Sequence, residues 1–130
     1  MTTGSQGRAP PPAAQGLPRA RRLTDKYQFD AVHRDGYRTS DALLMVIARP
    51  NGLGHARLGL AVGVRAAGNA ANRNRIKRVV RESFRLRRSD LPSVDLVVNA
   101  RPAAGQASNA QIRASAVALW ARICERCARS

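Results

Sequence analysis

Apolar residues follow two different periods along the chain, and the changes of period predict the order of its elements. Recurrence every three or four positions predicts three helices, over residues 24–35, 70–87 and 109–127. Short apolar runs between turn-forming residues predict four strands, over residues 37–39, 43–48, 57–64 and 95–100. Because sheet faces and helix stripes must bury each other, the order αβββαβα predicts an α+β fold, with three helices packed on a four-stranded mixed sheet.

Capping residues mark the ends of the predicted helices. Thr24 is the expected N-cap of the first helix, and Gly36 lies just past its end. Asn69 follows a glycine and is the expected N-cap of the second helix, while Asn109 is the expected N-cap of the last. The segment after Asn69 is therefore expected to be helical.

The first 20 residues differ from the rest in composition. Residues 1–20 hold four prolines, three glycines, two cations and no acid, without apolar periodicity. We therefore expect a disordered basic arm, followed by a single domain over residues 21–130. The arm lacks the apolar stretch of a secretory signal, and two cysteines do not make a disulfide framework. These features predict a cytoplasmic protein.

The chain is strongly basic, with 23 lysines and arginines against 8 acids and a formal net charge of +15. Of these cations, 21 are arginine, whose planar fork pairs with two phosphate oxygens and stacks on bases. No segment approaches the roughly 20 apolar residues of a membrane-spanning helix. Neither a helix-turn-helix nor a dimer interface for a DNA-binding factor is visible. We therefore expect an RNA partner, and neither a membrane nor DNA.

The predicted helix at 70–87 has two opposite faces. Its apolar arc, which can dock on a sheet, consists of Ile76, Val79, Val80, Ser83, Phe84 and Leu86. Its cationic arc consists of Asn74, Lys77, Arg78, Arg81 and Arg85. Lys77, Arg81 and Arg85 are spaced four residues apart, and like charges at this spacing destabilise a helix. A polyanion would relieve that repulsion, so we favour phosphate binding over an ordinary solvated face.

Residues suited to catalysis by the protein itself are sparse. The eight carboxylates are scattered, and none forms the pair that general acid–base catalysis or two-metal binding requires. Cys124 and Cys127 match C-x-x-C, but no second pair completes a zinc site, and the end of a helix does not lower a thiol pKa. We interpret the cysteines as packing residues and His55 as an ordinary loop residue, and expect neither catalytic residues nor a metal site.

Phe29 and His33 lie one turn apart on the first helix, and Met45 and Ile47 lie on a neighbouring predicted strand. Core packing is one explanation of this pattern. The other is a shallow apolar platform beside the arginines, which accepts an extended, unstacked nucleic-acid strand.

The segment Arg73-Asn74-Arg75-Ile76-Lys77-Arg78, followed by Arg81-Glu82-Ser83-Phe84-Arg85, resembles the RNR signature of bacterial ribonuclease P protein subunits. The resemblance extends to Arg22-Leu23, Leu53-Gly54-His55, residues 95–101 and residues 119–124. It implies an α/β sandwich in which the RNR helix connects two parallel strands by a left-handed β-α-β crossover, opposite to the usual hand.

The resemblance also implies a function. Proteins of this family assist the endonucleolytic removal of the 5′ leader from precursor tRNA, as the protein subunit of an endoribonuclease whose catalyst is RNA. The RNA subunit holds the Mg²⁺ ions, so the protein alone is expected to bind no cofactor. The implied partners are the catalytic RNA, in a 1:1 complex, and precursor tRNA.

Matching positions suggest the residues that bind each partner. Those expected to bind the catalytic RNA are Arg65, Arg73, Asn74, Arg75, Lys77, Arg78, Arg81 and Arg85. Those expected in the leader-binding cleft are Phe29, His33, Met45 and Ile47. His33 stands where the family commonly has Phe, and Val64-Arg65 stands where it often has two lysines. Composition alone leaves open a general structured-RNA-binding protein of ribosomal type, without a catalytic partner.

Overall fold

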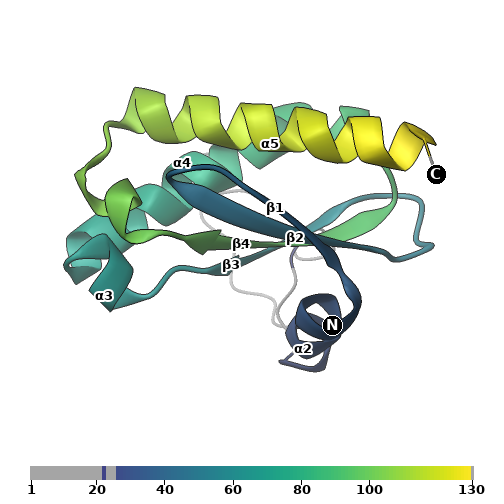
Figure 1. The fold of residues 1–130 in the computed structure, drawn as a ribbon, viewed down its shortest axis with the longest axis horizontal. Helices are drawn as coiled ribbons and strands as arrows, with labels where there is room; N and C mark the ends of the chain where they lie inside the picture. The colour runs from purple at the N-terminus through teal and green to yellow at the C-terminus, as the bar shows by residue number, and fades with distance from the viewer. Residues whose placement is uncertain (1–21, 23–25, 130) are drawn as a thin grey trace, which may run out of the picture.

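The structure of the protein is a computed structural model that describes residues 22 and 26–129. The arm of residues 1–20 and the N-cap Thr24 lie outside the described residues. The helices are α2 (Lys26–Asp35), α3 (Val64–Ala67), α4 (Ala70–Arg87) and α5 (Asn109–Arg129), as drawn in Figure 1. The strands are β1 (Tyr37–Ser40), β2 (Leu44–Pro50), β3 (Arg57–Ala61) and β4 (Val94–Ala100). Two 3₁₀ turns, Arg88–Asp90 and Pro102–Gln106, follow α4 and β4.

The strands form one sheet in the order β1-β2-β4-β3. The β1–β2 and β2–β4 pairs are antiparallel, whereas β3 and β4 are parallel. This confirms the predicted four-stranded mixed sheet. The chain between the two parallel strands contains α3 and α4, so the helix with the RNR signature lies inside a β-α-β unit. The hand of this crossover stays a prediction.

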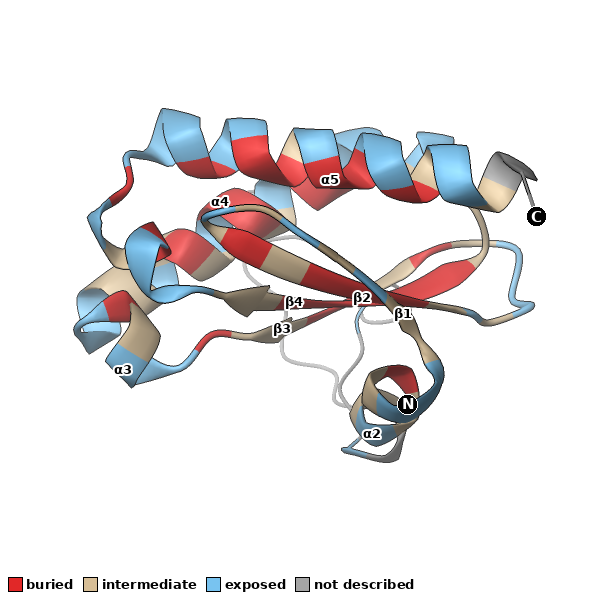
Figure 2. Ribbon diagram, in the orientation of Figure 1, coloured by how far each residue is buried: buried red, intermediate tan, exposed pale blue. Residues whose placement is uncertain are grey.

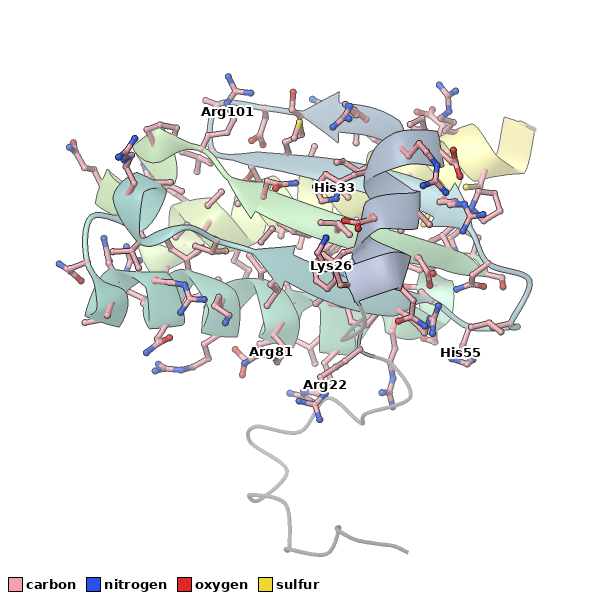
Figure 3. The ribbon with its side chains drawn as sticks, turned by 90° about the horizontal axis from the view of Figure 1, so that it is seen from below. Arg22, Lys26, His33, His55, Arg81 and Arg101 are labelled. Carbon is pink, nitrogen blue, oxygen red and sulfur yellow. The ribbon has the colours of Figure 1, made fainter. Side chains whose placement is uncertain are left out.

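The helices cover the two faces of the sheet unequally. In Figure 1, α4 and α5 lie together on one face, and α2 crosses the other. The main core lies between the sheet and the α4–α5 layer, and the buried positions of both helices turn toward the sheet (Figure 2). A second, smaller cluster lies under α2, where Val32, Ile47 and Val97 are fully buried. Because α2 has only ten residues, part of its sheet face is not covered by any helix of the described residues (Figure 3).

The apolar face of α4 is packed against α5 as well as against the sheet. Ile76, Val80 and Phe84 are fully buried. The Phe84 ring meets the Trp120 ring of α5 edge-on, with centroids 6.0 Å apart. Trp120 Nε1 donates a hydrogen bond to Ser83 Oγ at 3.0 Å, so the buried indole N–H has a partner. These contacts hold α4 in one orientation, with its cationic face turned away from the core.

Two predictions in this region were wrong. Leu86 is 64% exposed, because it lies at the margin of the apolar arc of α4. The strand predicted over residues 57–64 ends at Ala61, and residues 64–67 form the short additional helix α3. The pairing of β3 with β4 stops at Ala61 and Asn99, so the chain beyond has no strand partner, and its alanines favour a helical turn.

The N-cap of α5 is Ser108 rather than the predicted Asn109. Ser108 Oγ accepts a hydrogen bond from the Gln111 N–H at 3.1 Å, and Gln111 Oε1 accepts one from the Ser108 N–H at 2.8 Å. This reciprocal pair is a capping box, which satisfies two N–H groups at the start of the helix. The side chain of Asn109 is free to contact another element.

The two cysteines near the end of α5 pack as predicted. Cys124 and Cys127 are free thiols, partly buried against the main core. Burial raises the pKa of the Cys124 thiol above its usual value, and the neighbouring Cys127 adds to this rise. The Cys127 sulfur lies 3.6 Å from the Tyr37 hydroxyl of β1, so this end of α5 is attached to the edge strand.

A buried ion pair connects the two parallel strands. Arg57 Nε and Nη2 each donate a hydrogen bond of 2.8 Å to the Asp95 carboxylate, and the two residues are direct partners in the β3–β4 register. Asn51 Nδ2 donates a third, also of 2.8 Å. Asp95 is only 3% exposed, so these donors replace the water that would otherwise solvate its charge.

Candidate nucleic-acid interface

The start of α4 is fixed by side-chain hydrogen bonds. Asn69 is its N-cap, as predicted, and accepts a hydrogen bond from the Asn72 N–H at 2.8 Å. The Asn72 side chain donates to two backbone carbonyls, those of Ala67 at 2.7 Å and Gly105 at 2.6 Å. A Cβ on Gly105 would lie 2.8 Å from the Ala67 oxygen, so the β4–α5 connection packs tightly against the end of α3, just before α4 begins. The RNR segment therefore begins on a rigid base.

Two arginines of the RNR segment are anchored to neighbouring elements. Arg73 Nε donates to the Val62 carbonyl at 2.7 Å. Arg75 Nε donates to Asn72 Oδ1 and its Nη1 to Asn109 Oδ1, both at 2.7 Å. A guanidinium has five N–H donors, so each arginine keeps several for a ligand. The anchoring fixes where these donors lie before any RNA binds.

The remaining cations of α4 lie on its outer side. Arg78 and Arg85 are exposed, as is Asn74, while Lys77 and Arg81 are half-buried. None of the cations of α4 forms an ion pair with an acid in the part of the chain that the structure describes. Burial and the positive charges of Arg73 and Arg81 lower the pKa of Lys77 below its usual value. The face therefore carries uncompensated positive charge.

Arg65 lies close to the start of α4, on the short helix that precedes it. It is exposed on α3, whose C-cap Gly68 adopts a positive φ of 99° that residues other than glycine rarely take. The Gly68 N–H donates to the Val64 carbonyl at 2.7 Å, so the chain turns directly from α3 into α4. The structure thus groups Arg65 with the RNR segment.

The predicted cleft residues lie under and beside α2. Phe29 and His33 are both partly exposed, and His33 Nδ1 lies 2.9 Å from the Phe29 carbonyl oxygen one turn earlier. Because a carbonyl only accepts, Nδ1 carries the proton in this hydrogen bond. Met45 is also partly exposed, but Ile47 is fully buried beneath the helix. Ile47 therefore supports this surface from below, and its predicted contact with a ligand is corrected.

Two further residues belong to this surface and were missed from the sequence. Asn99 and Ala61 are aligned with Met45 across three strands, and both are partly exposed. Asn99 Nδ2 is buried and has no hydrogen-bond partner among the described residues. Such a donor usually has a partner in the native state. We call Phe29, His33, Met45, Ala61 and Asn99 the α2 surface.

The described residues offer neither a cluster of metal ligands nor a membrane-spanning helix. They contain no group of three or more His, Cys, Asp or Glu side chains placed to hold a metal ion. None of their helices has the length and apolar character needed to cross a membrane.

The fold and these surfaces define a small α+β nucleic-acid-binding domain. A sequence model of the family described as Ribonuclease P matches residues 17–124. The chain belongs to this family of ribonuclease P protein components, which places it in tRNA processing.

Relatives and solved structures agree over most of the chain. The ribonuclease P protein component of Methylococcus capsulatus is 43% identical over 120 residues, or 92% of this chain and 94% of that protein. Its counterpart in Thioalkalivibrio sulfidiphilus is 46% identical over 114 residues, covering 88% and 95%. The structure of the Staphylococcus aureus RNase P protein matches with a TM-score of 0.74 at 30% identity, covering 81% of this chain and 95% of that one. The Thermotoga maritima RNase P protein gives 0.71 at 31% identity, covering 78% and 96%. Nothing in these comparisons favours a ribosomal-type protein.

Proposed function

We propose that this protein binds the catalytic RNA of ribonuclease P through α4 and α3, and the 5′ leader of precursor tRNA through the α2 surface. The observation that carries the proposal is the row of unpaired cations on α4, held on a rigid base. Arg65, Arg73, Asn74, Arg75, Lys77, Arg78, Arg81 and Arg85 supply the contacts to the catalytic RNA. Phosphate groups would offset the mutual repulsion of these cations. This surface should therefore bind a polyanion more strongly than it binds a neutral ligand.

In this proposal the chemistry belongs to the RNA. The catalytic RNA would hold the Mg²⁺ ions on which cleavage depends, and one protein would bind one RNA. The protein contributes positive charge near the cleavage site, which reduces repulsion between the RNA and its precursor substrate. It also binds the single-stranded leader, which distinguishes the precursor from the mature product. Processing of precursor tRNA would place the protein in the cytoplasm.

The first test compares cleavage of a precursor tRNA by the catalytic RNA with and without the protein, over a series of Mg²⁺ concentrations. We expect the protein to lower the concentration of Mg²⁺ needed for half-maximal cleavage. The protein without RNA, incubated with Mg²⁺, should leave the precursor intact. Cleavage by RNA-free protein, or an unchanged Mg²⁺ requirement, would contradict the proposed division of labour.

A second prediction concerns the exposed cationic face. Arg78→Ala should leave the melting temperature unchanged, because the side chain points away from the buried face of α4. It should weaken binding to the catalytic RNA and reduce the slope of log affinity against log salt by about one, the loss of one phosphate contact. Glu82→Gln removes the single acid of α4 and is the matched control, for which the slope should be unchanged. An unaltered slope in Arg78→Ala would mean that this arginine faces only solvent.

A further inference from the structure

Arg22, which precedes the first helix, is held at the open edge of the sheet. Its backbone forms an isolated parallel bridge with Leu58 of β3. Because β3 is the last strand in the order β1-β2-β4-β3, this edge has no further strand of the sheet to pair with. Arg22 is exposed, so its backbone is positioned by the sheet while its side chain is available.

Arg81 reaches the same place from a different element. It lies on the outer side of α4, and Figure 3 shows Arg22 and Arg81 beside each other at this border of the molecule. Burial and the positive charge of Arg22 lower the pKa of the Arg81 guanidinium below its usual value, so the two charges are close enough to repel. Neither forms an ion pair with an acid within the described residues.

Two guanidinium groups that lie close together, with no acid of the described residues paired to either, can bind one anion jointly. Each guanidinium presents parallel N–H donors that match the two free oxygens of a phosphodiester. Their mutual repulsion in the free protein would become attraction when a phosphate lies between them. An anion that touched only one of the two would leave part of this repulsion in place.

We propose that Arg22 and Arg81 grip one RNA phosphodiester between them, as a clamp formed by the β3 edge and α4. The proposal rests on the proposed function, because it assigns a further binding residue to the same RNA-facing side. Arg22 lies outside the RNR signature, in a segment whose only described contact with the sheet is its bridge to Leu58. The clamp would join this segment and the RNR helix on a single phosphate.

The test is a double-mutant cycle with Arg22→Ala, Arg81→Ala and the double variant. Affinity for the catalytic RNA alone is measured over a range of salt concentrations, and affinity for precursor tRNA is measured with the preformed protein–RNA complex. These two affinity measurements, one arm with each RNA, show whether the phosphate belongs to the catalytic RNA or to precursor tRNA. Arg34→Ala is the matched control, since it removes an exposed cation of α2 that lies 3.3 Å from Asp35. The melting temperature of each free protein is measured in parallel.

If one phosphate is shared, the double variant should reduce the salt slope in one arm by about 0.7–0.9, the value for a single phosphate contact. Each single variant should reduce it by no more than that. Free Arg22→Ala should melt at the same or a higher temperature than the unaltered protein, because a repulsion has been removed. Arg34→Ala should leave the slope unchanged.

A reduction of about 1.4–1.8 in the double variant would indicate two separate phosphates and overturn the clamp. The same holds for an unchanged slope in both arms, or for a lower melting temperature of Arg22→Ala, which would assign its side chain to the fold. Failure of the unaltered protein to bind the catalytic RNA would instead refute the proposed function. The two failures are therefore distinguishable.

Discussion

Replacing Asp95 by alanine should lower the free energy of unfolding by about 3–5 kcal/mol, the cost of breaking a buried ion pair from one side. Asp95 accepts two hydrogen bonds from Arg57 and one from Asn51, each of 2.8 Å. These bonds raise the pKa of Arg57, which would stay charged after the substitution, in a site where its side chain is only 17% exposed. Denaturant unfolding of the free protein measures the loss.

The loss should extend beyond the ion pair itself. Asn51 Oδ1 accepts hydrogen bonds from the Leu53 N–H at 2.9 Å and from Ser93 Oγ at 2.6 Å, so it also organises the turn before β3. Without Asp95 to orient its amide, Asn51 holds this turn less firmly. The amides of residues 52–55 should therefore exchange hydrogen faster in Asp95→Ala than in the unaltered protein.

An exposed ion pair provides the control. Lys26 and Asp30 lie 3.0 Å apart on α2, with side chains 87% and 53% exposed. Asp30→Ala should cost no more than about 1 kcal/mol, because water solvates the remaining lysine. Replacing Arg57 and Asp95 together, by methionine and leucine, should recover most of the stability lost in Asp95→Ala. Equal costs for Asp95→Ala and Asp30→Ala would contradict the burial of this pair.

The sequence predicted α4 well, because the features that define this helix are local. Its cap at Asn69, its apolar stripe and its cationic face all follow from spacing within the single segment of residues 69–87. The details that failed depend on neighbours. Leu86 fits the helical period of the stripe, yet its side chain is left exposed. The chain after Ala61 has strand-like valines, yet β4 offers it no further pairing.

The α2 surface was only partly predictable, because its composition depends on strand register. Phe29 and His33 follow from one helical turn, and Met45 from its adjacent strand. Asn99 and Ala61 join them only through the alignment of β2, β4 and β3, which residues far apart in the sequence determine. The parallel pairing that brings Arg57 to Asp95 is a long-range feature of the same kind. Local periodicity contains no information about it.

A substitution on the α2 surface should have the second large effect, on discrimination between precursor and mature tRNA. Phe29→Ala should weaken binding of precursor tRNA to the protein–RNA complex by about 1–3 kcal/mol, the value for one base stacked on an aromatic ring. Phe29 is partly exposed and packs against the small cluster of Val32, Ile47 and Val97, so part of its side chain remains accessible to a ligand. Mature tRNA has no leader, and its affinity should hardly change.

The other phenylalanine of the chain is the matched control. Phe84 is fully buried, so Phe84→Ala should lower the free energy of unfolding by about 3–5 kcal/mol. Phe29→Ala should cost less, because its side chain is only partly buried. In folded Phe84→Ala protein, the affinities for precursor and mature tRNA should change by the same factor. In Phe29→Ala, only the affinity for precursor tRNA should fall. Equal losses for both tRNAs in Phe29→Ala, with a fall in melting temperature as large as that of Phe84→Ala, would mean that Phe29 is a packing residue and that the leader binds elsewhere.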